Sequence, residues 1–313
     1  MAIIKKKLIL HCGTYKTGSS SLQNFLFANR EILQKNSILY PLTGVRNDSI
    51  LGRRHFIYRF IQNTQLLEEL LTEVNESGAK YIIISHEALS RPKHKDFVEM
   101  LVALFHANNF QLEGYLFVRN YYEYVIKYYR EFVRRNGTKD PFEIFIFKNK
   151  QILNYLKISN YLNNSIDKNV FIPYDNSKDT IASFFNETKI PFNYKKKDRE
   201  DEANKGKDFV ITEIYRQLNI LGKKGQELNT LADLINNKYF KSGKQIKLYS
   251  DGIEDLSLLT PPKKDYLNKL SISLNWDHKQ TEMLYINNYS SAKNLSKELK
   301  NDVATCLKKE CLI

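Results

Sequence analysis

The chain has 313 residues, and its 48 Lys and Arg against 35 Asp and Glu give a formal charge of +13. Hydrophobic residues make up 42% and aromatic residues 12%, which is enough to build a core and excludes a disordered basic tail. Cys12, Cys306 and Cys311 have neither the number for a disulfide framework nor the spacing of a zinc site. The charge predicts an anionic partner: nucleic acid, an acidic glycan, a phosphorylated cofactor or an anionic lipid surface.

Four short apolar segments predict buried strands, at residues 7–12, 80–85, 113–118 and 169–173. Each is apolar on both faces, and segments of helical length separate them. We expect those helices at about 19–35, 64–76, 95–108, 121–135 and 141–165. Strands of this kind are typical of a parallel sheet that helices cover on both faces, so the sequence predicts an α/β fold with a central parallel sheet.

The composition changes after Pro191, where a charged stretch reads as a mobile loop, and from residue 207 onward the pattern is helical. We therefore expect one domain over 1–313, with an α/β core at 1–190 and a charged loop and helical extension at 191–313. No segment has the roughly 20 apolar residues that a membrane-spanning helix needs. The apolar run after Lys5, Lys6 and Lys7 is too short for a signal peptide, so we expect a cytoplasmic protein.

The first predicted strand leads directly into a turn rich in glycine and serine, from Gly13 to Ser21, after which a helix is expected. Glycines let a backbone turn close to a ligand, and the amides at a helix start, with nearby hydroxyls, favour phosphate oxygens. Lys16 adds a cation. Because it precedes Gly18 rather than following it, the turn departs from the Walker A pattern and a magnesium-dependent NTPase is disfavoured. The alternative is an ordinary turn in which a serine caps the helix.

A second candidate anion site follows the third predicted strand, which ends at Arg119. An arginine at the end of a strand suits bidentate phosphate binding. Lys127 lies eight residues further along the expected helix. Glu123 and Glu131 lie four residues before and after it, the spacing of exposed helix ion pairs, so Lys127 stays open between a phosphate ligand and an ion-pair partner.

The stretch GTYKTGSSSLQNFL at 13–26 resembles the 5′-phosphosulfate loop of the sulfotransferases that use 3′-phosphoadenosine-5′-phosphosulfate. KNSILYP at 35–41, SHEALS at 85–90 and VFIPYDN at 170–176 extend the resemblance to bacterial, carbohydrate-type members over most of residues 7–190. The resemblance implies a P-loop-like fold in which the lysine of the loop, here Lys16, neutralises charge at the bridging oxygen of the donor. The donor-binding residues that it implies are Tyr15, Lys16, Thr17, Gly18, Ser19, Ser20 and Ser21.

The family's 3′-phosphate motif has an arginine at a strand end and a serine eight residues beyond it. Arg119 matches that arginine, and Lys127 replaces the serine, which removes a hydroxyl and keeps a cation suited to phosphate. The expected cofactor is therefore 3′-phosphoadenosine-5′-phosphosulfate, without a metal.

Sulfuryl transfer also requires a base for the attacking hydroxyl. His55, in GRRHFIYRF, resembles a histidine of bacterial and glycan-directed members, and an imidazole accepts a proton near pH 7 without tuning. Glu87, in SHEALS, matches a family glutamate that serves as a base, an acceptor clamp or a structural cap. We expect His55 to be the base. Arg53 and Arg54 are candidates for holding an acidic acceptor, with solvated surface charge as the alternative.

The resemblance implies a carbohydrate or glycolipid acceptor on the bacterial surface, and the enzyme has no expected nucleic-acid partner. Peripheral association with the inner membrane is compatible with the charge. Two other functions remain as alternatives. A nucleotide-dependent kinase requires a metal-binding carboxylate beside its nucleotide loop, and a basic nucleic-acid-binding protein requires clustered cations interleaved with aromatics. The sequence leaves the oligomeric state open.

Overall fold

A computed structural model describes residues 6–45, 54–55, 57–63, 65–149, 154–174, 179–195, 209–240, 264–283 and 292–309. The chain divides into two compact units, each formed from segments that are distant in sequence. The first is drawn from 1–120, 154–198 and 264–284, and the second from 121–153, 199–263 and 285–313. In the described part of the chain, no helix combines the length and the apolar character needed to cross a membrane.

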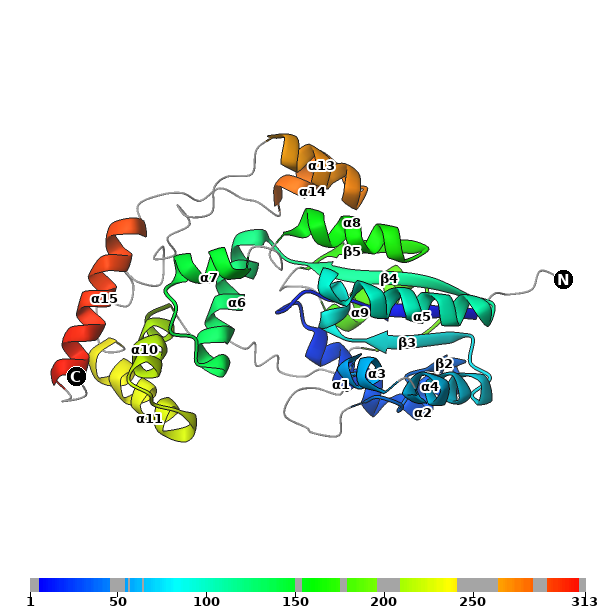
Figure 1. Cartoon of the computed structure of the whole chain (residues 1–313), viewed down its shortest axis with the longest axis horizontal. Helices are drawn as coiled ribbons and strands as arrows, with labels where there is room; N and C mark the ends of the chain where they lie inside the picture. The colour runs from blue at the N-terminus through cyan, green and yellow to red at the C-terminus, as the bar shows by residue number, and fades with distance from the viewer. Residues whose placement is uncertain are drawn as a thin grey trace. The chain divides into compact units, whose positions relative to one another are not determined.

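The first unit is built on a five-stranded sheet in which every described pairing is parallel (Figure 1). Its strands are β1 (Lys6–His11), β2 (Ile38–Leu39), β3 (Tyr81–Ser85), β4 (Phe110–Val118) and β5 (Lys168–Pro173). Their order across the sheet is β2-β3-β1-β4-β5, so β1 lies in the centre between β3 and β4. The α/β fold with a central parallel sheet is confirmed.

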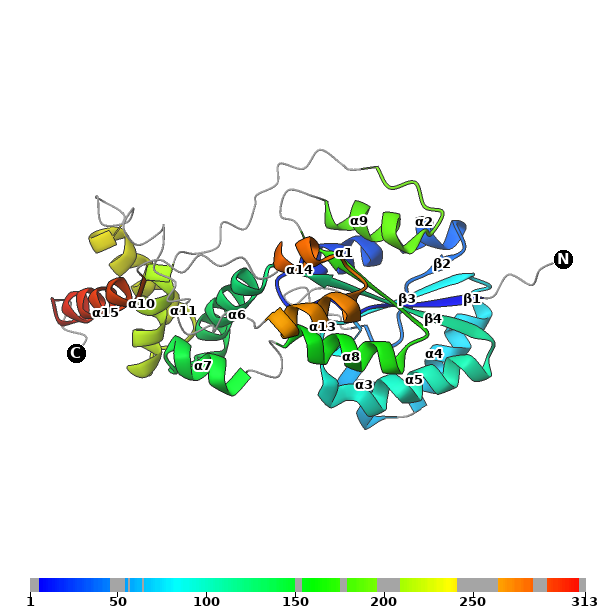
Figure 2. The same ribbon diagram turned by 90° about the horizontal axis from the view of Figure 1, so that it is seen from above.

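Helices cover both faces of this sheet (Figure 2). On one face lie α1 (Ser19–Ala28), α2 (Arg30–Lys35) and α9 (Thr180–Thr188), and on the other lie α3 (Ile57–Gln62), α4 (Gln65–Glu76), α5 (Lys95–Ala107) and α8 (Tyr155–Ser165). Two short 3₁₀ turns, η1 (Glu87–Ser90) and η2 (Pro92–His94), connect β3 to α5. The unit also contains α13 (Lys264–Leu274) and α14 (His278–Met283).

Apolar side chains of the central strands pack against the helices of the first face. Ile9, Leu22, Leu26 and Phe184 are fully buried in one cluster that joins β1, α1 and α9. Burial of such side chains contributes about 1.5–3 kcal/mol each, so this cluster fixes where α1 begins relative to the end of β1. The packing therefore positions the turn that connects them.

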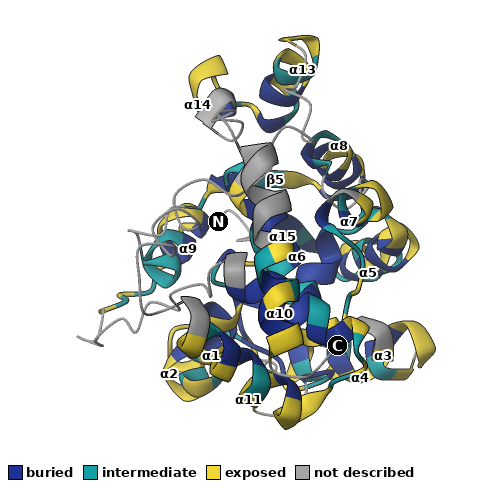
Figure 3. Cartoon of the chain, turned by 90° about the vertical axis from the view of Figure 1, so that its left-hand side faces the viewer, coloured by how far each residue is buried: buried dark blue, intermediate teal, exposed yellow. Residues whose placement is uncertain are grey.

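The second unit is helical in its described residues. It contains α6 (Tyr121–Asn136), α7 (Phe142–Asn149), α10 (Phe209–Ile220), α11 (Gly225–Ile235), a π-helical turn η3 (Asn236–Phe240) and α15 (Ala292–Lys309). Buried residues run along α6 and α10 (Figure 3), and the Asn219 side-chain amide donates to the carbonyl of Val133 at 2.7 Å. From residue 209 onward, the described residues show the helical character that the sequence predicts for this region.

Several elements differ from the sequence-based expectation. The expected helix at 19–35 is divided into α1 and α2 at Asn29, and that at 141–165 into α7 and α8. Strand β2 and helix α9 were not expected. Helix α13 packs against α8, where the Ser159 hydroxyl donates to the carbonyl of Ser273 at 3.0 Å. Of the expected loop after Pro191, residues 196–208 lie outside the described residues.

Candidate functional site

The carboxyl ends of β1, β3 and β4 meet at one edge of the sheet. The chain passes from β1 to β2 and β3 on one side, and then crosses to β4 on the other side of β1. The connections that follow β1 and β4 therefore lead to opposite faces. In open parallel sheets, ligands bind in the crevice between adjacent strands whose connections lead to opposite faces. This edge carries the turn at 13–18, the segment 86–91, and Arg119.

Short hydrogen bonds hold the turn between β1 and α1. The amide and the hydroxyl of Thr14 both donate to the carbonyl of Phe117 on β4, at 3.3 and 2.9 Å. The Thr17 hydroxyl donates to the carbonyl of Thr14 at 2.6 Å. Lys16 and Gly18 both adopt left-handed backbone, with φ of 66° and 76°. Alternation of this kind turns successive amides toward one concave side, the arrangement known as an anion nest.

Helix α1 begins at Ser19 without a side-chain cap. No hydrogen bond joins the amides of Thr17, Gly18, Ser19 or Ser20 to an acceptor within the described ranges. These donors and the positive end of the helix dipole favour an anion. Gly18 is required on two grounds, because a Cβ in its place would lie 2.5 Å from the Thr180 hydroxyl and its φ is left-handed.

The side chains of the predicted donor-binding residues differ in burial: some are buried within or beneath the turn, and others are exposed above it. Thr17 is fully buried and its hydroxyl is used within the turn, so it offers its amide to a ligand. Ser19 is buried beneath the turn, while Lys16, Ser20 and Ser21 are exposed above it. The phenol of Tyr15 accepts from the guanidinium of Arg91, whose central carbon also lies 4.9 Å from the centre of the tyrosine ring.

Arg119 lies at the end of β4, as expected. Its side chain is 3% exposed, and its guanidinium carbon lies 4.3 Å from the centre of the Tyr174 ring. Its carbonyl accepts from the Tyr155 hydroxyl at 2.8 Å. These contacts hold the arginine at the end of the strand that pairs with β1, at the same sheet edge as the turn.

Lys127 lies in the middle of α6, in the second unit. Its amino group is 3.7 Å from the Glu123 carboxylate four residues earlier, and both side chains are at least one-third exposed. The ion-pair alternative from the sequence thus corresponds to a contact in the structure. Phosphate binding by Lys127 stays a prediction.

Glu87 begins the turn η1, directly after β3 and His86. Its side chain is 9% exposed, and one carboxylate oxygen lies 3.3 Å from the guanidinium of Arg54. His86 caps the same turn, since its Nδ1 accepts from the Ala88 amide at 2.9 Å. Burial and neighbouring cations, Arg54 first, lower the pKa of His86 well below its usual range. Arg53 lies outside the described residues.

His55 is fully buried, and the backbone engages both of its ring nitrogens. Nε2 donates to the carbonyl of Pro41 at 3.0 Å, and Nδ1 accepts from the amide of Ser85 at 3.2 Å. Burial lowers the pKa of His55 to about 4. An imidazole with both nitrogens occupied cannot accept a proton from a substrate hydroxyl, so this geometry does not support His55 as the base.

A buried polar group that was not predicted from the sequence lies beneath the turn. His11, the last residue of β1, places Nδ1 2.7 Å from the Ser85 hydroxyl. The Gln23 side-chain amide donates to the same hydroxyl at 3.1 Å. All three residues have zero exposure. A histidine directly after the apolar run Leu8–Leu10 is the one local signal that could have indicated this group.

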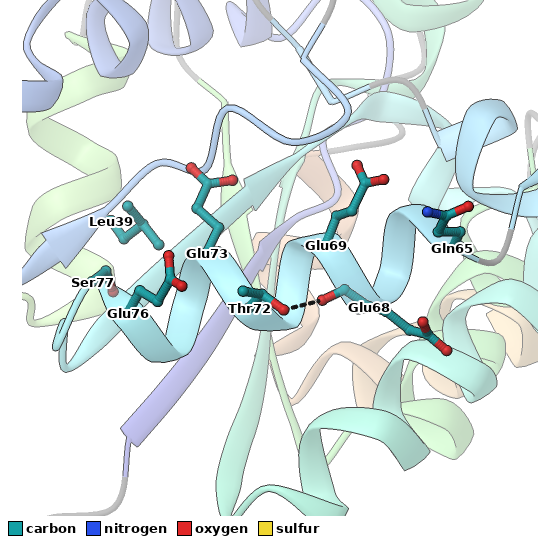
Figure 4. A pocket seen from close by; sticks show the side chains of 8 residues that line it. All are labelled: Leu39, Gln65, Glu68, Glu69, Thr72, Glu73, Glu76 and Ser77. Carbon is teal, nitrogen blue, oxygen red and sulfur yellow. Dashed lines mark hydrogen bonds between the residues drawn. The ribbon is translucent and has the colours of Figure 1, made fainter.

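A hollow of about 660 Å³ lies along α4, away from the turn (Figure 4). Its lining includes the carboxylates of Glu68, Glu69, Glu73 and Glu76. Four carboxylates would repel an anionic nucleotide, and the Glu73 carboxylate accepts from the amides of Leu42 and Thr43. We therefore place the candidate site at the carboxyl edge of the sheet.

Within the described ranges, no group of three or more His, Cys, Asp or Glu side chains is arranged to hold a metal ion. Comparisons of the chain with family models, with curated proteins and with solved structures found no match.

Proposed function

We propose that the chain is a sulfotransferase that carries a sulfuryl group from 3′-phosphoadenosine-5′-phosphosulfate to a hydroxyl. The observation that supports this proposal best is the pair of anion-binding positions on adjacent strands. The turn after β1 offers unpaired amides and Lys16, and the end of β4 offers Arg119. A nucleotide with phosphates at two separate positions matches two such sites, whereas the 5′ chain of ATP requires only one.

The proposed reaction is an in-line displacement at sulfur. The acceptor oxygen forms a bond to sulfur while the bond from sulfur to the 5′-phosphate oxygen breaks, and 3′-phosphoadenosine-5′-phosphate leaves. Negative charge builds on the bridging oxygen, where the ammonium of Lys16 and the amides of the turn stabilise it. The step requires no metal, because these groups supply the positive charge on the leaving side.

The proton of the acceptor hydroxyl goes to Glu87 in this mechanism. Glu87 follows β3, at the same edge as the turn, and one of its carboxylate oxygens lies 3.3 Å from the Arg54 guanidinium. Both nitrogens of His55 are engaged by the backbone, so Glu87 is the better candidate. A carboxylate in a low-dielectric setting is an adequate base when it reaches the hydroxyl directly.

For the acceptor we propose a carbohydrate or glycolipid hydroxyl of the bacterial surface, reached from the cytoplasmic side. Support comes from the sequence resemblance and from the charge of +13, which favours acidic glycans and anionic lipid surfaces. Peripheral association with the inner membrane agrees with the same charge.

A thermal-shift comparison tests the proposal. Stabilisation by a ligand follows its concentration relative to its dissociation constant, so 3′-phosphoadenosine-5′-phosphate should raise the melting temperature more than AMP or ATP at equal concentration. A preference for ATP would indicate the kinase alternative. Stabilisation by oligonucleotides that disappears steeply with salt would indicate the nucleic-acid-binding alternative.

A further inference from the structure

Three buried polar atoms beneath the turn have no hydrogen-bond partner among the described residues: Nε2 of His11, the hydroxyl of Ser19 and Oε1 of Gln23. A buried polar group without a partner destabilises the fold, so such a group points to a missing ligand. Here the first two face the same space. A Cβ built on Gly13 would lie 2.5 Å from the Ser19 hydroxyl oxygen and 3.1 Å from His11 Nε2.

The hydrogen bonds around Ser85 determine where the proton of His11 lies. The Ser85 oxygen accepts from the Gln23 amide, so its own proton is available for the second neighbour at 2.7 Å, His11 Nδ1. An Nδ1 that accepts leaves the proton of the neutral ring on Nε2. The rings of Phe117 and Phe184 pack edge-on at 5.8 Å and hold the imidazole in place.

We propose that His11 is a neutral hydrogen-bond donor to the anion that the turn binds. Its Nε2 proton points to the space beside Gly13, and the Ser19 hydroxyl contacts the same anion. The inference rests on the proposed function only for the identity of that anion, the 5′-phosphate end of the donor nucleotide. Ser85 and Gln23 act as positioning residues, because they fix the tautomer of His11 without reaching the ligand.

A neutral donor suits this position. Burial lowers the pKa of His11 to about 3, so the ring carries its single proton throughout the neutral range. A charged imidazolium would bind the product nucleotide as strongly as it binds the sulfuryl-donor nucleotide. A neutral N–H bond to an anionic oxygen contributes binding and orientation with a smaller penalty for product release.

The tautomer is measured first, on the whole chain labelled with ¹⁵N-histidine. Long-range ¹H–¹⁵N spectra should show the His11 proton on Nε2, with signals assigned by their loss in His11→Gln. If that variant does not fold, Phe184→Leu identifies them through the altered ring current. A proton on Nδ1 would overturn the inference, and it would indicate that the Gln23 amide has the opposite orientation, with Oε1 toward Ser85.

Titrations with 3′-phosphoadenosine-5′-phosphate and with inorganic phosphate then test the ligand. Both should shift the His11 Nε2 and Hε2 signals. If phosphate alone shifts them and the nucleotide does not bind, the inference stands and the proposed function fails. If neither shifts them, the inference fails. If the nucleotide binds without moving these signals, the proposed function stands and the inference fails.

Two substitutions form a matched pair for calorimetry. The amide of His11→Gln reaches the position of Nε2 and retains the donor, whereas that of His11→Asn reaches only the position of Nδ1. We expect His11→Gln to bind the product nucleotide within a few-fold of wild type and His11→Asn to bind about 10- to 100-fold more weakly. Equal affinity in two folded variants would contradict the inference.

Discussion

His55 and Ser85 bind each other through reciprocal hydrogen bonds: the His55 amide donates to the Ser85 carbonyl at 3.1 Å, and the Ser85 amide donates to Nδ1 of His55 at 3.2 Å. The histidine thus anchors residues 54–55 to the end of β3, which Glu87 follows by two residues. These two bonds give His55 a structural contact with the end of β3.

Substitutions should distinguish the role of His55 from that of Glu87. We expect His55→Ala to lower the free energy of unfolding by about 2–5 kcal/mol, because it leaves a cavity and two unpaired backbone groups. Its folded fraction should keep a kcat within a few-fold of wild type. Glu87→Gln should lower kcat at least a hundredfold with donor binding unchanged. Sulfuryl-transfer kinetics at a temperature where both variants are folded measure the difference, and the opposite pattern would return the base to His55.

Stability should fall on mild acidification. Burial holds the pKa of His11 at about 3 and that of His55 at about 4, both below the unfolded value of about 6.5. The unfolded chain therefore binds more protons, and the free energy of unfolding decreases as the pH falls below about 6.5. Each histidine contributes a slope that approaches about 1.4 kcal/mol per pH unit.

Urea unfolding between pH 7 and pH 5 measures this slope, in a range where carboxylates hardly titrate. The variants His11→Gln and His55→Gln should each show a shallower dependence than wild type. Identical slopes in all three proteins would mean that each histidine has the same pKa in the folded and in the unfolded chain.

Lys16→Ala should lower kcat by about a hundredfold to a thousandfold, because the ammonium stabilises charge that develops during transfer. Binding of 3′-phosphoadenosine-5′-phosphate should weaken much less. Calorimetry with this nucleotide and a sulfate-transfer assay give the two quantities. Lys35→Ala is the control, since Lys35 is exposed at the end of α2, shortly before β2 begins. Equal losses of binding and turnover would assign Lys16 to ground-state binding.

Arg119→Ala should weaken nucleotides that carry a 3′-phosphate by about 10- to 100-fold and leave AMP nearly unaffected. Arg119→Lys keeps the charge and loses the bidentate fork, so it should recover only part of the affinity. Competition binding with the two nucleotides measures this selectivity. Lys127→Ser and Lys127→Ala complete the series: unchanged affinity in both would leave Lys127 as an ion-pair partner of Glu123.

Local patterns in the sequence determined the α/β class and the main strands. Apolar runs at 7–12, 80–85, 113–118 and 169–173 predicted β1, β3, β4 and β5 to within a few residues, because buried strands need apolar side chains on both faces. Glycines and serines after β1 predicted the turn that leads into α1, and Arg119 directly followed an apolar strand. Each of these signals lies within a few consecutive residues.

Tertiary structure decided the features that depend on distant partners. The two-residue strand β2 exists through its pairing with β3, and the break at Asn29 leads the chain from α1 into α2. The contacts of His55 and His11 were set in the same way. Ser85 contacts His55, 30 positions away in the sequence, and His11, 74 positions away. The packing of the sheet brings these residues together. Composition and spacing do not predict these contacts, because the contacts form only when β1 and β3 pair.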